Sequence, residues 1–104
     1  MPYAWVYVIT NKHNTTLYTG VSNDLSVRLW EHRTKQDPKC FTARYNIYKL
    51  VYYEEYDSIG EAIEREKYIK RKSRKWKEDL VNRVNPGWDD LTNEVSNTPL
   101  ASRR

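Results

Sequence analysis

The chain has 104 residues, which is enough for one compact domain and too few for two. It carries 18 Lys and Arg against 14 Asp and Glu, and this formal net charge of +4 favours a polyanionic partner only weakly. A single cysteine, Cys40, excludes a disulfide framework and a thiolate metal cluster; it has no helix-start context, so we interpret it as an ordinary residue. We expect no membrane association and a cytoplasmic protein, because no stretch approaches the ~20 apolar residues of a membrane span and the first residues lack signal-peptide organisation.

The first third of the chain predicts a β-hairpin followed by a helix. Residues 3–10 are almost all β-branched or aromatic, which is typical of a strand covered on both faces. A polar turn over residues 11–14 leads into a second strand over residues 15–21. Asp24 is a typical N-cap, and the apolar spacing after it predicts a helix that ends near Lys35.

The rest of the chain predicts one more strand and two more helices. Residues 35–43 form a loop in this interpretation, and residues 45–56 form the third strand. Ser58 and Glu61 match the capping box of a following helix, and Ser73 is placed to cap another.

These elements predict an α+β fold: a three-stranded, mostly antiparallel sheet flanked by helices, in the order β-β-α-β-α-α. We place the domain at residues 1–91 and expect residues 92–104 to be a polar, flexible C-terminal tail.

Five side chains on these elements could act together. Tyr7 and Tyr18 belong to the two strands of the hairpin, so they can be neighbours on the sheet. Arg28 and His32 are four residues apart and share a helix face. Glu66 is the only acid within a dense run of Lys and Arg on a later helix. Two phenols, a guanidinium, an imidazole and a carboxylate form the candidate catalytic set.

The chemistry of this set fits phosphodiester hydrolysis. Arg28 can match two oxygens of a phosphoryl transition state, and Glu66 can hold one divalent cation, Mg²⁺ or Mn²⁺, that adds positive charge. A phenol near a metal and an arginine can have a lowered pKa, and the imidazole of His32 titrates near neutrality, so either could take a proton from water. Each residue also has a structural explanation: the tyrosines can be packing, and Glu66 can pair with Lys70.

A basic segment and a glycine extend the candidate site toward a nucleic acid. Eight Lys or Arg and one acid lie between residues 65 and 77, which is an electrostatic footprint if it faces a ligand and a solvated helix face otherwise. A glycine at the end of the second strand lets a phosphate approach closely. The residues that we expect to contact nucleic acid are Gly20, Lys70, Arg71, Lys72, Arg74 and Lys75.

The order and spacing of these residues resemble the GIY-YIG nuclease family. A Trp-Val-Tyr sequence ends at Tyr7, a Tyr-Thr-Gly sequence ends at Gly20, and Arg28 follows that glycine by eight residues. An acidic helix motif surrounds Glu66, and the likeness covers roughly residues 3–91. The first tripeptide keeps only the tyrosine of the family motif. The resemblance implies a three-stranded antiparallel sheet flanked by helices and one-metal hydrolysis of DNA.

The resemblance also implies a role for each residue of the set. Tyr18 would be the phenolic general base or the group that positions water, with Tyr7 as its partner near the phosphate. Arg28 would stabilise the pentavalent phosphate, and His32 would relay a proton. Glu66 would hold the single Mg²⁺ or Mn²⁺ ion.

The leading hypothesis is therefore a metal-dependent DNA endonuclease. The alternative is a nucleic-acid-binding module with the same fold and little or no hydrolytic activity. Branched DNA, single-stranded DNA, RNA and a targeting protein partner all stay open as partners, and so does the oligomeric state. Asn82 and Asn85 are two candidates for an asparagine that the family carries.

Overall fold

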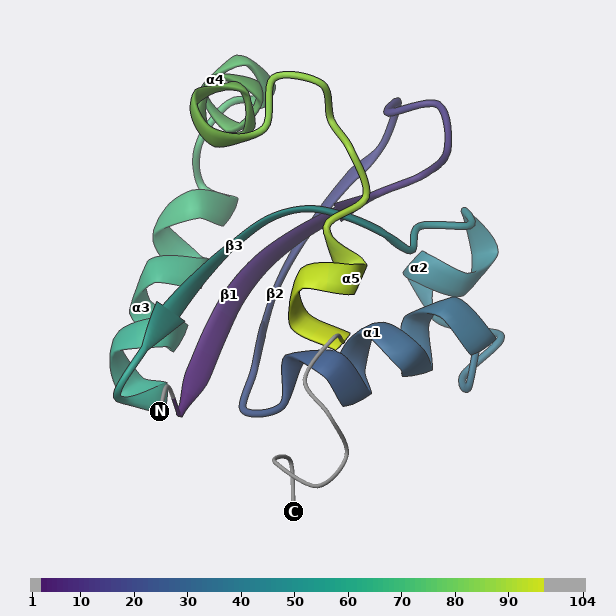
Figure 1. Cartoon of the computed structure of the whole chain (residues 1–104), viewed down its shortest axis with the longest axis horizontal. Coiled ribbons are helices and arrows are strands. Elements are labelled where there is room, and N and C mark those ends of the chain that lie inside the picture. Colours follow the sequence, from purple (N-terminus) through teal and green to yellow (C-terminus); the bar gives the residue numbers. More distant parts are fainter. Residues whose placement is uncertain (1–2, 97–104) are drawn as a thin grey trace.

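The computed structural model describes residues 3–96 and contains one sheet with helices on both faces (Figure 1). The three strands are antiparallel and lie in the order β2-β1-β3, which confirms the predicted α+β fold. In chain order the elements are β1 (Ala4–Thr10), β2 (Leu17–Ser22), α1 (Leu25–Thr34), α2 (Phe41–Arg44), β3 (Lys49–Tyr56), α3 (Ile59–Lys70), α4 (Arg74–Val84) and α5 (Thr92–Ser96).

The central strand β1 is buried on both faces, as its apolar sequence predicts. Ala4, Val6 and Val8 point to the face that α3 and α4 cover, where they pack with residues of those helices. Tyr7 and Ile9 point to the opposite face, which α1 and α5 cover. Successive side chains of a strand alternate between faces, so β1 contributes to both halves of the core.

The helix starts predicted from capping residues are confirmed. The side chains of Asp24, Ser58 and Ser73 each accept a hydrogen bond from the backbone amide three residues on, at 3.3, 3.3 and 3.2 Å. These bonds satisfy amides that have no partner within the first turn of a helix. Lys35 ends α1 in the left-handed conformation, with φ 54°.

The segment between α1 and β3 differs from the prediction. Residues 41–44 form the short helix α2 inside the predicted loop, and β3 begins at Lys49 instead of residue 45. The amide of Tyr45 still bonds to the carbonyl oxygen of Phe41, and Asn46 is left-handed with φ 55°. An extended strand cannot pass through a left-handed residue, so the aromatic pattern of residues 45–48 does not become strand.

The folded region also extends past the predicted boundary at residue 91. Thr92–Ser96 form α5, and its Val95 packs against the core cluster that contains Leu25 and Leu29. Asp90 accepts a hydrogen bond from the amide of Thr92 at the start of α5. The remainder of the predicted tail, residues 97–104, lies outside the described residues.

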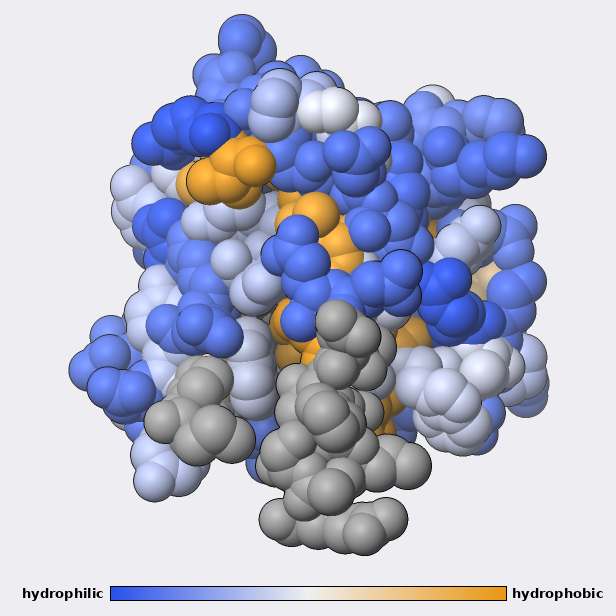
Figure 2. Space-filling model, viewed as in Figure 1, coloured by the Kyte–Doolittle hydropathy of each residue, from blue (hydrophilic) through white to orange (hydrophobic). Residues whose placement is uncertain are grey.

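The face of the molecule seen in Figure 1 is largely hydrophilic, and its apolar patches are small and separate (Figure 2). Within residues 3–96, no helix combines the length and the apolar character that crossing a membrane requires.

Candidate active site

Tyr7, Tyr18 and His32 form a cluster of three rings between the sheet and α1. Ring centroids are 5.9 Å apart for Tyr7 and His32, 5.8 Å for Tyr18 and His32, and 6.5 Å for the two tyrosines. Tyr7 pairs across the ladder with Gly20, and Tyr18 pairs with Ile9. The two phenols are therefore diagonal neighbours on one face of the hairpin and do not lie directly opposite each other.

Gly20 makes room for Tyr7. A Cβ atom built on Gly20 would overlap Cζ and Oη of the Tyr7 ring. The ring therefore fills the space that we expected a phosphate to use. The structure gives this glycine a packing reason, and the predicted phosphate contact of Gly20 receives no support from it.

A chain of hydrogen bonds starts at Tyr7 and ends at Cys40. The phenol oxygen of Tyr7 lies 3.0 Å from Nε2 of His32, and Nδ1 of His32 lies 2.9 Å from Oγ1 of Thr42. Thr42 Oγ1 in turn lies 3.3 Å from Sγ of Cys40. Tyr7 and Thr42 are buried and His32 is 9% exposed, so this chain runs through the interior behind the site.

Burial keeps both ends of the Tyr7–His32 bond neutral. Desolvation raises the pKa of Tyr7 to about 12, although the adjacent Arg28 guanidinium opposes this shift. Desolvation, together with repulsion by Arg28, lowers the pKa of His32 to about 4. A neutral imidazole has one donor and one acceptor nitrogen. We infer that the Tyr7 hydroxyl donates to Nε2 and that Nδ1–H donates to Thr42. Arg28 alone therefore does not lower the pKa of the Tyr7 phenol below its ordinary value, because desolvation outweighs the effect of the arginine.

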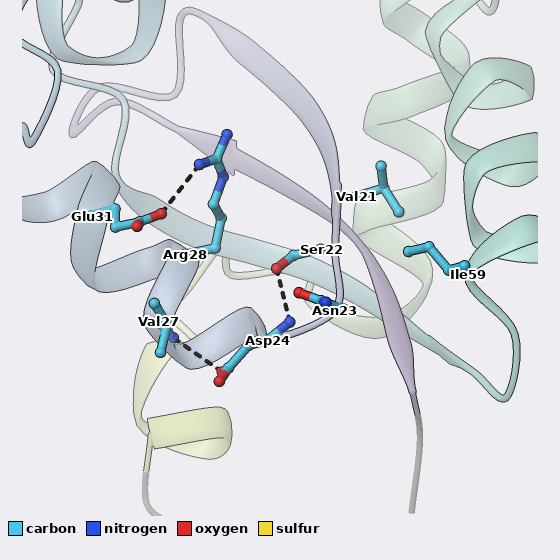
Figure 3. Close-up of a pocket in the computed structure, with 8 residues that line it drawn as sticks. All are labelled: Val21, Ser22, Asn23, Asp24, Val27, Arg28, Glu31 and Ile59. Carbon is cyan, nitrogen blue, oxygen red and sulfur yellow. Dashed lines mark hydrogen bonds and ion pairs between the residues drawn. The ribbon is translucent and has the colours of Figure 1, made fainter.

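Arg28 lies on the solvent side of this cluster, between two pockets. Its guanidinium is 3.1 Å from the carboxylate of Glu31, and the two side chains are 46% and 39% exposed. In the first pocket, Val21 and Ile59 form the wall opposite Arg28 (Figure 3). The second pocket is lined by Arg28, Glu31, His32, Gln36, Asp37 and Cys40. An exposed ion pair contributes little to stability, so an incoming anion can replace Glu31 beside Arg28.

Glu66 lies at the edge of the ring cluster. Its side chain is only 12% exposed and forms an ion pair of 2.9 Å with Lys70, whose Nζ lies 5.9 Å from the centroid of the Tyr18 ring. The negative charge of Glu66 raises the pKa of Tyr7 slightly, as the smallest of the causes that shift it. The pairing of Glu66 with Lys70 that the sequence left open is therefore present.

The donor set around Glu66 fits one hard divalent cation. Among residues 3–96, no group of three or more His, Cys, Asp and Glu side chains could hold a metal ion. Mg²⁺ does not need such a group, because it keeps several waters and binds through one or two carboxylates and the phosphates of a substrate. Glu66 offers the single, nearly buried carboxylate that this mode of binding needs, although it lines neither of the two pockets beside Arg28.

Arg74, a predicted phosphate contact, has a structural role. It donates to the carbonyl oxygens of Asn14 and Thr15, at 2.7 and 2.6 Å, and to the carboxylate of Glu78, at 2.8 Å. These bonds fasten the start of α4 to the turn of the β1–β2 hairpin. A guanidinium with three such acceptors is not available to a phosphate, so we leave Arg74 out of the proposed DNA contact.

The remaining basic residues of this segment differ in their availability. Lys75 forms an exposed ion pair of 2.8 Å with Asp79, and Nζ of Lys72 lies 4.3 Å from the ring centroid of Tyr68. Both interactions can yield to a phosphate. The Arg71 side chain makes no hydrogen bond or ion pair with another residue in 3–96. Arg71 follows Lys70 directly and is an available cation at the C-terminal end of α3.

Asn82 and Asn85 both belong to the packing of the C-terminal segment. The buried Asn85 donates to the carbonyl oxygens of Val51 and Asp89 and accepts from the Asp89 amide. Asn82 accepts a hydrogen bond of 2.6 Å from the indole of Trp88. These partners fully occupy the Asn85 side chain and engage only the amide oxygen of the exposed Asn82, so packing accounts for Asn85 and not for the whole of Asn82.

Thr42 and Cys40 were not among the candidate residues. Both come from the segment that the sequence predicts as a loop, and no periodicity marks a four-residue helix. The expectation that Cys40 lacks a helix-start context was wrong, because Cys40 is the N-cap of α2. Its hydrogen bond with Thr42 lowers the pKa of the thiol, and the backbone of Ala43 adds to this effect.

Comparison with known proteins places this geometry in a family. The GIY-YIG catalytic domain matches residues 3–79. A UPF0213 protein of Staphylococcus saprophyticus is 35% identical over 78 residues, which cover 75% of this chain and 93% of the relative. A UPF0213 protein of Clostridium perfringens is 36% identical over 78 residues, covering 75% and 82%. The solution NMR structure of a UPF0213 protein from Bacillus halodurans has a TM-score of 0.53 and 28% identity, covering 86% of this chain and 94% of that one.

Proposed function

Since the chain belongs to the GIY-YIG catalytic domain family, we propose that it is an endonuclease that hydrolyses DNA phosphodiester bonds with one divalent metal ion. The observation that carries this proposal is the convergence of the candidate set. The consecutive elements β1, β2 and α1 and the later helix α3 bring together two phenols, an imidazole, a guanidinium and a carboxylate.

Arg28 binds the scissile phosphate in this proposal. Its guanidinium lines two pockets and adjoins the phenol of Tyr7, and its ion-pair partner, the exposed Glu31, is easily displaced. Two parallel N–H donors match two phosphoryl oxygens and favour the extra charge of the transition state. Arg28 therefore contributes more to the rate than to the binding of the ground state.

Tyr7 and His32 move the proton. The neutral His32 accepts a hydrogen bond from the Tyr7 hydroxyl at Nε2 over 3.0 Å, so the Tyr7 oxygen can take a proton from the attacking water as its own proton passes to the imidazole. A phosphate held by Arg28 adds negative charge near His32 and offsets the repulsion that lowers its pKa. Tyr18, beside His32 on the same sheet face, positions the attacking water.

Glu66 is the residue that would hold the metal ion. When bound, Mg²⁺ or Mn²⁺ supplies positive charge to the phosphate and to the leaving oxygen. Lys70 currently neutralises Glu66 at 2.9 Å, and its flexible ammonium is free to turn toward the DNA backbone once the carboxylate has another partner. Lys70 and Arg71 then hold the DNA without reading its bases.

Cleavage assays with variants of the site test the proposal. Supercoiled plasmid, duplex and single-stranded DNA are incubated with pure protein in Mg²⁺, in Mn²⁺ and in EDTA. Glu66→Gln and Arg28→Ala should each slow metal-dependent cutting roughly a hundredfold or more. Glu64→Gln on the exposed face of α3 and Arg83→Ala on α4 are matched controls that should cut at the wild-type rate.

The outcomes distinguish the two hypotheses. Cutting that needs a metal and is lost in both site variants supports the nuclease. Equal cutting by the wild type and the site variants indicates a contaminating nuclease and overturns the proposal. Salt-sensitive DNA binding without cutting of any substrate favours the binding module.

A further inference from the structure

A row of three aromatic rings leads from the candidate active site to the surface. Tyr18, next to His32, is stacked with Phe41 at a centroid distance of 6.5 Å and an interplanar angle of 28°. Phe41 in turn lies 4.8 Å from Tyr45. Phe41 and Tyr45 are 48% and 51% exposed. The row therefore starts at the rings of the candidate site and ends in two aromatic side chains that are about half exposed to solvent.

Packing does not explain these exposed rings. Neither Phe41 nor Tyr45 belongs to the two core clusters of residues 3–96. Both sit on or directly after α2, a helix of four residues that otherwise contributes Thr42 and Ala43 to the interior. Large aromatic surface left in water is unfavourable, so its position beside an active site points to a ligand.

Positive charge flanks the row at both ends. At the inner end, the ammonium of Lys70 lies 5.9 Å from the centre of the Tyr18 ring. At the outer end, Tyr45 borders a pocket that it shares with Asn11, Lys12, His13, Asn46 and Tyr48. Stacking surfaces between cations match the alternation of bases and phosphates in a nucleic-acid strand.

We propose that Tyr18, Phe41 and Tyr45 form a stacking platform for unpaired bases, and that the natural substrate is single-stranded DNA next to the scissile phosphate. This inference rests on the proposed nuclease function. An aromatic ring binds a base through its flat face, and in a duplex the faces are hidden between neighbouring base pairs. Only an unpaired strand can place its bases on Phe41 and Tyr45 while its backbone reaches Arg28.

Binding measured without cleavage tests the platform. Fluorescence anisotropy in EDTA compares a short labelled DNA strand of mixed sequence, its duplex, and an RNA strand of the same sequence. The double variant Phe41→Leu/Tyr45→Leu keeps apolar bulk and loses the ring faces. It should bind the single DNA strand roughly tenfold or more weakly, since each stacked base contributes strongly. Its affinity for the duplex should change less than twofold.

Two further variants separate stacking from folding. Phe41→Tyr/Tyr45→Phe keeps both rings and should bind the single strand as the wild type does. Tyr3→Leu removes a ring that is 69% exposed at the other end of β1, and it should leave both affinities unchanged. Circular dichroism melts of each variant check that the domain folds.

Three results would overturn the inference. They are a wild type that does not prefer the single strand, a leucine variant that binds it normally, and a leucine variant that loses affinity for single strand and duplex equally. A loss confined to the RNA strand would also overturn the assignment to DNA. The proposed nuclease function fails if every substrate resists cleavage in Mg²⁺ and in Mn²⁺. The binding measurements need no cleavage, so they still test the stacking platform in that case.

Discussion

Gly20 of β2 lies directly opposite Tyr7 of β1, and the Tyr7 ring occupies the space over the glycine that a Cβ atom would need. The close approach lets a large phenol fold back across its own hairpin and reach His32 on α1. A β-strand usually favours residues larger than glycine. Position 20 requires glycine because the ring of Tyr7, a candidate catalytic residue, fills the space beside it.

Gly20→Ala should destabilise the protein by about 2 kcal/mol, because the new methyl group forces the buried Tyr7 ring out of its position. Urea denaturation measures the change. In a Tyr7→Ala background the same substitution should cost far less, since the overlapping atoms are gone. An equal cost in both backgrounds would contradict the packing explanation.

Thr42→Val should slow cleavage roughly tenfold through kcat, with little change in KM. The substitution removes the acceptor for Nδ1–H of His32, so the proton is free to move to Nε2, where it blocks transfer from Tyr7. Thr42→Ser keeps the hydroxyl and should restore the rate. The ¹⁵N chemical shifts of the His32 ring report the tautomer; unchanged shifts in the valine variant would refute this role.

The stability of the protein should fall as the pH decreases from 6.5 to 4. His32 titrates near 6.5 in the unfolded chain and at about 4 in the folded protein, so the unfolded state binds the extra proton within this window. The loss attributable to His32 between pH 7.5 and 5.0 is about 2 kcal/mol. Urea denaturation of wild type and His32→Gln at both pH values measures it. The same pH dependence in both proteins would be inconsistent with a buried neutral imidazole.

The salt dependence of DNA binding should identify the phosphate contacts. Arg71→Gln should weaken binding and reduce the slope of log K against log salt by about one, because an available cation no longer releases counterions. Arg74→Gln should leave that slope unchanged and lower the melting temperature instead, since its guanidinium holds the hairpin turn. If Arg74→Gln reduced the slope and Arg71→Gln did not, the DNA would lie along α4.

The sequence predicted the features that depend on neighbouring residues. Side-chain caps at Asp24, Ser58 and Ser73 start helices through bonds that reach three residues, and these predictions are confirmed. The strand over residues 3–10 followed from its β-branched and aromatic composition. Local patterns failed where the decisive feature was a single backbone angle, as at Asn46, or a helix of only one turn, as in α2.

The partners of the candidate residues depended on tertiary structure. Sequence could place Tyr7 and Gly20 on adjacent strands, but only the register shows that one fills the space above the other. The pKa values of Tyr7 and His32 depart from ordinary values because α1 and α2 bury both groups, and burial is a property of packing.

Order and spacing along the chain determined the family and the identity of the candidate catalytic residues, since these are carried by short motifs. The same motifs do not predict the hydrogen bond between His32 and Thr42. They also do not predict that Arg74 donates to backbone carbonyl oxygens of the hairpin turn. Each of these pairs joins segments that meet only when the chain folds, and a hydrogen bond or an ion pair is decided by distance in space.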